Sequence, residues 1–109
     1  GVGDVGAVVL RDRKILAEDG MVVVILNLQH GQLLSEPEII TRGFIYVKES
    51  EELLSELKEV AAHAALSVIG AKKSRDSGEL RGAVKSAVSG YLFKHTKRSP
   101  MIIPVVNRL

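Results

Sequence analysis

Three histidines are the first candidates for chemistry in this sequence of 109 residues. His30, His63 and His95 are widely spaced, and no two of them form a His-x-His or His-x-x-x-His pair. A zinc site needs three or four converging ligands, and cysteine, the other common zinc ligand, is absent. We therefore expect the histidines in a turn, on a surface and at a helix end, and we expect no metal or cofactor in this chain.

The carboxylates gather on the outside of one predicted helix. General acid or base catalysis needs a partly buried carboxyl group, which an exposed helix face does not provide. Serine, histidine and aspartate are all present, but without the Gly-x-Ser-x-Gly motif of a strained nucleophile turn. We therefore expect no active site. The carboxylates concerned are Glu49, Glu51, Glu52, Glu56 and Glu59.

Gly1, Gly3 and Gly6 match the dinucleotide-binding pattern G-x-G-x-x-G. That motif works inside a unit that crosses over to a parallel strand, whereas here the next predicted strand follows a tight turn at Gly20. We interpret residues 1–6 as a loop.

Basic residues form the remaining candidate site. Lys94, Lys97 and Arg98 surround a threonine between a helix end and Pro100, and cations of this kind can hold the phosphates of RNA. Residues 1–59 hold 11 acidic and 6 basic residues, whereas residues 60–109 hold 2 acidic and 9 basic residues. The alternative is that these cations only cap a helix and aid solubility. Three further cations in a predicted interhelix loop would extend the surface: Lys72, Lys73 and Arg75.

The apolar pattern predicts three or four strands. Residues 21–26 are apolar throughout, which is typical of a strand covered on both faces or lying at an interface. A turn at His30-Gly31 leads to a short strand at residues 32–34, and a third strand is predicted at residues 43–47. For residues 39–40 the sequence predicts either a half turn or a strand extension. A last strand covers residues 101–106, where Pro104 indicates an edge position or a bulge.

Two long helices and one short helix complete the prediction. An apolar stripe runs from Leu53 to Val68 after a capping serine at position 50, and a second stripe runs from Leu80 to Leu92. Residues 6–18 fit a short helix that Gly20 would close. We therefore predict an α+β two-layer sandwich, in which two amphipathic helices cover one face of a small mixed sheet. Residues 1–20 would form the end of a linker, and residues 21–109 the domain.

Three stretches, in this order and at these separations, resemble the C-terminal domain of ribonuclease J. The first is GVGDVG running into VLRDR and LAEDG within residues 1–20, the second is ITRGFIYV at residues 40–47 with Glu49-Ser50, and the third is TKRSPMIIPV at residues 96–105. The resemblance implies a bacterial RNA-processing nuclease with a metallo-β-lactamase domain and an inserted β-CASP domain. It also implies 5′-to-3′ exonuclease and internal cleavage activity, and a centre of two divalent metals, zinc or manganese.

The family's metal-binding motif, His-x-His-x-Asp-His, is absent from these 109 residues. The chain departs from the family at Arg98-Ser99, where members often have two arginines, and this leaves a less active paralogue open. The resemblance implies an accessory end that supports full activity and subunit assembly.

Our main hypothesis is a cytoplasmic, non-catalytic domain whose sheet face packs against its own nuclease core or against another subunit. That subunit would be identical or a paralogous ribonuclease J. Val22, Val24 and Leu26 are the predicted interface residues, since apolar side chains on a bare sheet face are costly to leave in water. The alternative is an RNA-backbone-binding module that uses the basic cluster. We expect RNA contact through the parent enzyme and no membrane partner, since no apolar stretch approaches the roughly 20 residues of a membrane span.

Overall fold

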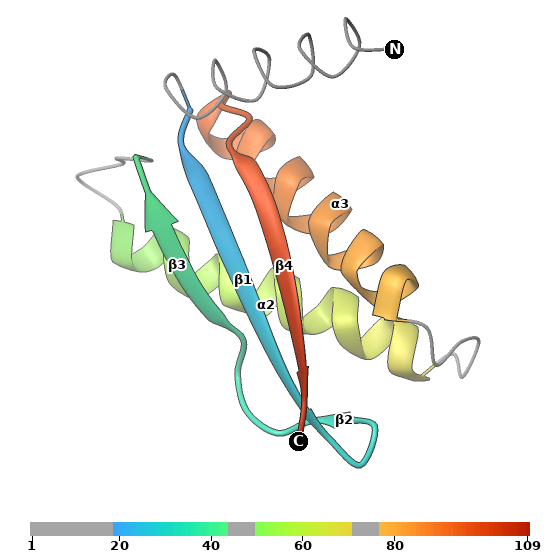
Figure 1. The fold of residues 1–109 in the computed structure, drawn as a ribbon. Coiled ribbons are helices and arrows are strands. Elements are labelled where there is room, and N and C mark those ends of the chain that lie inside the picture. Colours follow the sequence, from blue (N-terminus) through green and yellow to red (C-terminus); the bar gives the residue numbers. More distant parts are fainter. Residues whose placement is uncertain (1–18, 44–49, 71–76) are drawn as a thin grey trace, which may run out of the picture.

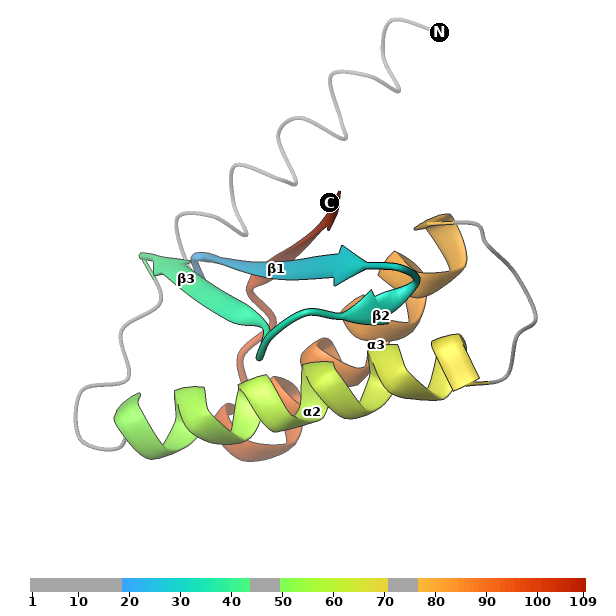
Figure 2. The same cartoon turned by 90° about the horizontal axis from the view of Figure 1, so that it is seen from below.

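The computed structural model describes residues 19–43, 50–70 and 77–109. In these residues one layer of β-strands lies on one layer of two helices, as Figures 1 and 2 show. This confirms the predicted α+β two-layer architecture. The elements, in chain order, are β1 (Met21–Gln29), β2 (Gln32–Leu33), β3 (Glu38–Arg42), α2 (Ser50–Gly70), α3 (Ser77–Thr96) and β4 (Met101–Arg108).

β1 is the central strand of a mixed sheet. β4 pairs with it in parallel along one edge, and β2 and β3 pair with it antiparallel. Leu28 pairs with Leu33 and Ile25 with Glu38, so two residues of β1 lie between these pairs, whereas four residues, 34–37, lie between them on the other segment. These four residues form the irregular stretch that ends at Pro37 and separates β2 from β3.

The turns follow the sequence signals. His30 and Gly31 have φ angles of 53° and 74° and join β1 to β2, which is the two-residue hairpin geometry that needs positive φ at both positions. Gly20, immediately before β1, has a φ of 81° and confirms the predicted turn.

Pro104 lies in an edge strand, as its lack of an N–H group predicts. The backbone N–H of Met101 donates to the carbonyl oxygen of Gly20 at 2.9 Å, and that of Leu109 to Leu28 at 2.8 Å. Alternate residues of β4 therefore turn their N–H groups toward β1, and Pro104 belongs to the set that faces the free edge. The proline removes no hydrogen bond from the β1–β4 ladder.

Both long helices begin and end close to the predicted positions. Carboxylates in the first turn of α2, Glu51 and Glu52, lie at the positive end of the helix dipole. Each helix turns a stripe of residues four positions apart toward the sheet, and α3 lies against β4 while α2 lies against β2 and β3. The buried stripes are Leu53, Leu57, Ala61 and Ala65 on α2, and Leu80, Val84, Val88 and Leu92 on α3.

The third described strand covers the residues for which the sequence left a half turn or a strand extension open. β3 covers residues 38–42, and the chain bends at Gly43, whose φ is 69°. Pro37 directly precedes the strand, and both Ile39 and Ile40 pair with β1. Residues 44–47 of the predicted strand, and the whole predicted helix at residues 6–18, lie outside the described residues. The division into residues 1–20 and 21–109 stays a prediction.

None of the helices in the described ranges is long and apolar enough to cross a membrane.

Candidate interaction surfaces

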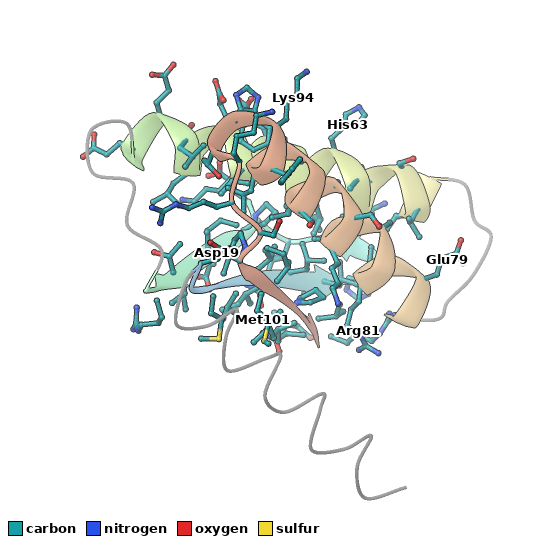
Figure 3. The ribbon with its side chains drawn as sticks, turned by 90° about the horizontal axis from the view of Figure 1, so that it is seen from above. Asp19, His63, Glu79, Arg81, Lys94 and Met101 are labelled. Atoms are coloured by element: carbon teal, nitrogen blue, oxygen red, sulfur yellow. The ribbon has the colours of Figure 1, made fainter. Side chains whose placement is uncertain are left out.

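The side of the sheet that faces away from the helices is largely apolar and has no cover among the described residues. In β1 the side chains alternate, with Val22, Val24 and Leu26 beneath the helices and Met21, Val23 and Ile25 on the opposite side. Figure 3 shows Met101 on this opposite side, and His63 and Lys94 on the outer side of the helices. We call this apolar side the open face.

Strand register arranges the open face as three rows that run across the sheet. Residues paired across neighbouring strands point to the same side of the sheet, so each row takes one residue from β3, β1 and β4. Seven of the nine residues are apolar, and the other two lie at the ends of β3. The rows are Arg42–Met21–Met101, Ile40–Val23–Ile103 and Glu38–Ile25–Val105.

A hydrogen-bonded pair closes one end of the open face. Asn27 and Asn107 are partners in the next row of the register, and the amide Nδ2 of Asn107 donates to Oδ1 of Asn27 at 3.0 Å. The apolar part of the open face therefore ends at this polar pair.

The three residues predicted from the sequence as the interface need a correction. Val22, Val24 and Leu26 are fully buried, with no exposed surface, because their side chains pack against α2 and α3. The run at residues 21–26 is apolar at every position, so the sequence contained no alternation that would separate the two faces. The charged residues Glu38 and Arg42, two positions on either side of Ile40, were the available signal for the exposed face.

The basic cluster at the end of α3 consists of Lys94, Lys97 and Arg98. Local hydrogen bonds fix the backbone that carries it. The N–H of Lys97 donates to the carbonyl of Phe93 at 2.9 Å, and Lys97 adopts a left-handed φ of 61°. The hydroxyl of Thr96 donates to the carbonyl of Leu92 at 2.7 Å and accepts from the N–H of Arg98 at 3.1 Å. These bonds form a helix C-cap, which fixes the backbone conformation at the start of the cluster.

All three cations of this cluster are exposed. The Lys97 ammonium lies 5.5 Å from the centre of the Phe93 ring, within cation–π range. Asp19 approaches the same segment, where its Oδ2 accepts from the N–H of Ser99 at 3.2 Å. The cluster is therefore accessible to a polyanion, but one of its cations already contacts an aromatic face and a carboxylate lies beside its end.

The described structure does not place the second group of predicted cations next to the cluster of Lys94 to Arg98. Lys72, Lys73 and Arg75 lie outside the described residues, between the end of α2 and the start of α3. The first described residue after them, Ser77, begins α3, whereas the cluster of Lys94 to Arg98 follows its last turn. A helix of 20 residues is about 30 Å long, so α3 separates that point from the cluster by about this distance.

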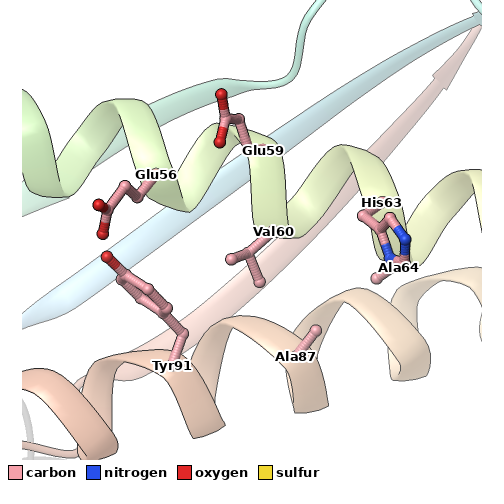
Figure 4. Close-up of a pocket in the computed structure, with 7 residues that line it drawn as sticks. All are labelled: Glu56, Glu59, Val60, His63, Ala64, Ala87 and Tyr91. Carbon is pink, nitrogen blue, oxygen red and sulfur yellow. The ribbon is translucent and has the colours of Figure 1, made fainter.

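A groove lies between α2 and α3 on the surface away from the sheet (Figure 4). Its volume is about 510 Å³, and Val60, Ala64 and Ala87 supply its apolar part. The hydroxyl oxygen of Tyr91 is buried here and has no hydrogen-bond partner. In Figure 4 this hydroxyl points toward Glu56. The rest of the lining is acidic or imidazole: Glu56, Glu59 and His63.

The histidines occupy the kinds of position that the sequence predicts. His30 lies in the β1–β2 turn, His63 lines the groove, and His95 stacks on Tyr91 with ring centres 4.2 Å apart. In the described ranges, no group of three histidine, aspartate or glutamate side chains comes together in a way that could hold a metal ion. The described residues thus do not fit the two-metal centre that the resemblance implies for the parent enzyme.

Comparisons with known proteins agree with the resemblance. The sequence model of the family described as the ribonuclease J C-terminal domain matches residues 8–109. The chain is 42% identical to ribonuclease J2 of Bacillus subtilis over 108 residues, which make up 97% of this chain and 19% of that protein. It is 43% identical over 111 residues to ribonuclease J 2 of Staphylococcus epidermidis, covering all of this chain and 20% of the relative. The chain therefore spans about a fifth of the length of these curated relatives.

Proposed function

Because this chain belongs to the family of ribonuclease J C-terminal domains, we propose that it acts as the non-catalytic accessory domain of an RNA-processing nuclease. Its role is to support subunit assembly and full activity of the parent. The parent is a metal-dependent 5′-to-3′ exoribonuclease and endoribonuclease of the cytoplasm, which works in RNA processing and decay. Its metals are held by the nuclease core and not by this domain.

The open face is the observation that carries this proposal. Seven apolar side chains lie together on one side of the sheet, and no described element covers them. Covering apolar surface releases about 2.5 kcal/mol for every 100 Å² that leaves water. Contiguous apolar surface that is still partly exposed on one side of a sheet supports a protein interaction site there. The open face would pack against the parent's own core or against another ribonuclease J subunit.

Introducing two lysines into the open face tests the assembly role. The experiment uses the full-length protein that carries this domain. The double substitution Val23→Lys and Ile103→Lys places charge in the middle row of the open face. We expect at least a tenfold weaker subunit association and a corresponding loss of ribonuclease activity, because the charges would have to be buried at the contact. Light scattering over a concentration series and an exonuclease assay measure the two effects.

The control is Lys85→Glu, which changes an exposed residue on α3. Circular dichroism must show that the double variant still folds. An unchanged oligomer and unchanged activity in a folded double variant would contradict the assembly role.

An RNA-binding role for the basic cluster is the second candidate, and one observation favours it. Lys97 occupies the left-handed position after a helix, where glycine is the usual residue because a side chain there is strained. The left-handed backbone at Lys97 supports a functional role for this residue, because strained backbone positions cluster at functional sites. Lys94 and Arg98 stand beside it.

Reversing two charges of the cluster tests RNA binding. If Lys97 and Arg98 each contact a phosphate, the double substitution Lys97→Glu and Arg98→Glu should weaken the affinity of this chain for single-stranded RNA at least tenfold at low salt. The slope of log affinity against log salt should fall by about 1.4, since each phosphate contact contributes about 0.7. Fluorescence anisotropy over a salt series measures both quantities.

The matched control is Arg81→Glu with Lys85→Glu, which makes the same change of net charge elsewhere on α3. Equal losses in the two double variants would mean that net charge alone acts, and the cluster would not be a binding site.

A further inference from the structure

We propose that the groove between α2 and α3 binds an arginine side chain that a segment of a partner protein presents. The groove lies on the outer side of the helices, opposite the open face, so the inference goes beyond the assembly role proposed above. An arginine carries a planar cationic head on an apolar stem. The lining of the groove offers a place for each part.

Two oxygen acceptors without partners form the polar end of the groove. The hydroxyl oxygen of Tyr91 is buried and has no hydrogen-bond partner, and it points across the groove toward Glu56 (Figure 4). The Glu56 carboxylate is half-buried and makes no hydrogen bond or ion pair with another described residue. Buried polar groups are nearly always hydrogen-bonded, so these two acceptors indicate a ligand with several N–H donors.

A ring contact holds the hydroxyl of Tyr91 in this position. The ring of His95 lies on the ring of Tyr91, with centres 4.2 Å apart and planes tilted by 33°. The two residues lie one turn apart on the same face of α3. Since His95 covers one face of the tyrosine ring, the ligand would meet the hydroxyl end. An acceptor that is held in place before binding lowers the entropy cost of the complex.

The apolar part of the groove fits the stem of the same side chain. Val60 and Ala64 on α2 lie opposite Ala87 on α3, and the two alanines leave space within a volume of about 510 Å³. Arginine buries its methylene groups along such a surface while its head stays with polar partners. The guanidinium can donate two parallel hydrogen bonds to a carboxylate and a further one to a hydroxyl oxygen.

The charge of the lining selects an arginine within a polypeptide over other ligands. Of the seven described residues that line the groove, two are glutamates and none is a lysine or an arginine. The exposed carboxylate of Glu59 adds negative charge at the rim. Phosphate groups and the carboxylate of a free amino acid would be repelled here. An arginine inside a polypeptide carries no such anion, and a groove of this volume holds more than one guanidinium.

An NMR titration of the isotope-labelled chain tests the groove with a blocked tripeptide that has arginine between two alanines. We expect saturable shifts of the amide signals that flank the groove on α2 and α3. The dissociation constant should lie in the millimolar range, because the probe supplies a single anchor. Citrulline in place of arginine keeps the shape without the charge and should weaken binding about fivefold or more. Lysine should bind about threefold more weakly than arginine, since it is a point charge with stronger hydration.

Three variants locate the binding site. Glu56→Gln should weaken binding of the arginine peptide about fivefold, and Tyr91→Phe about two- to threefold, since each removes an acceptor or a charge. Ala87→Leu fills the apolar part without changing charge and should weaken binding about tenfold. The matched control is Glu51→Gln, which makes the same change of charge at an exposed residue of α2 outside the groove lining. The amide spectrum of each variant shows that it folds.

Equal losses in Glu56→Gln and Glu51→Gln would reveal a general charge effect and overturn the site. A citrulline peptide that binds as tightly as the arginine peptide would overturn recognition of the cation. Free arginine that binds as tightly as the blocked peptide would overturn the assignment to a protein segment. The absence of saturable shifts up to about 10 mM peptide would overturn the proposal as a whole. None of these results bears on the open face, whose test is subunit association.

Discussion

Val24→Lys is expected to destabilise this domain severely at 25 °C. The side chain of Val24 has no exposed surface and lies between the sheet and the helices. A lysine there must bury an unpaired ammonium group or lose its proton, and it must also fit a longer side chain into a packed core. The cost should exceed about 4 kcal/mol, a large part of the 5–15 kcal/mol that stabilises a typical domain. Circular dichroism and urea denaturation measure the effect.

The neighbouring substitution Val23→Lys is the matched control. Val23 lies on the open face, where a lysine can extend its ammonium group into water. We expect a loss of no more than about 1.5 kcal/mol, since the change exchanges a β-branched residue for a poorer strand former. Equal losses at the two positions would contradict the described facing of β1.

Leu57→Ala is expected to lower the free energy of unfolding by about 2–5 kcal/mol. Leu57 is fully buried at the middle of the α2 stripe, and it is among the largest fully buried side chains of the described residues. The substitution removes buried methyl groups and leaves a cavity, which the rigid sheet beneath can only partly close. For a domain of this size the melting temperature should fall by about 10–25 °C.

Leu66→Ala makes the same chemical change on the same helix at a residue that is 54% exposed. Its cost should stay below about 0.5 kcal/mol, because the side chain faces solvent and alanine is the better helix former. Chemical denaturation of both variants compares the two sites. A large loss at Leu66 together with a small one at Leu57 would show that the face of α2 has been assigned wrongly.

The helices could be predicted from the sequence almost to the residue. Their apolar residues recur at four-residue spacing, a glycine ends α2, and acidic and basic residues lie at the favourable ends of α3. Each of these signals acts between residues close in the chain. The β1–β2 turn followed for the same reason, because His30-Gly31 favours the conformation that the hairpin needs.

The strand bounds were harder to predict where the signal was ambiguous. Pro37 lies directly before β3, where a proline costs no hydrogen bond within the strand. Glu38–Arg42 then pairs along β1, and Gly43 ends it. Only the partner strand decides between this register and a later one.

The sequence by itself determined the order of the long helices and the β1–β2 hairpin, and Pro104 indicated an edge position or a bulge for β4. It also determined the family to which the chain belongs, because these features depend on local spacing and on residue identity. The tertiary structure alone decided which face of β1 is open. Residues 21–26 are apolar at every position, so only the packing of α2 and α3 places Val22, Val24 and Leu26 inside and Met21, Val23 and Ile25 outside. It alone also brought Glu38, Ile40 and Arg42 into rows with β1 and β4, since cross-strand pairing joins residues that lie far apart in the chain.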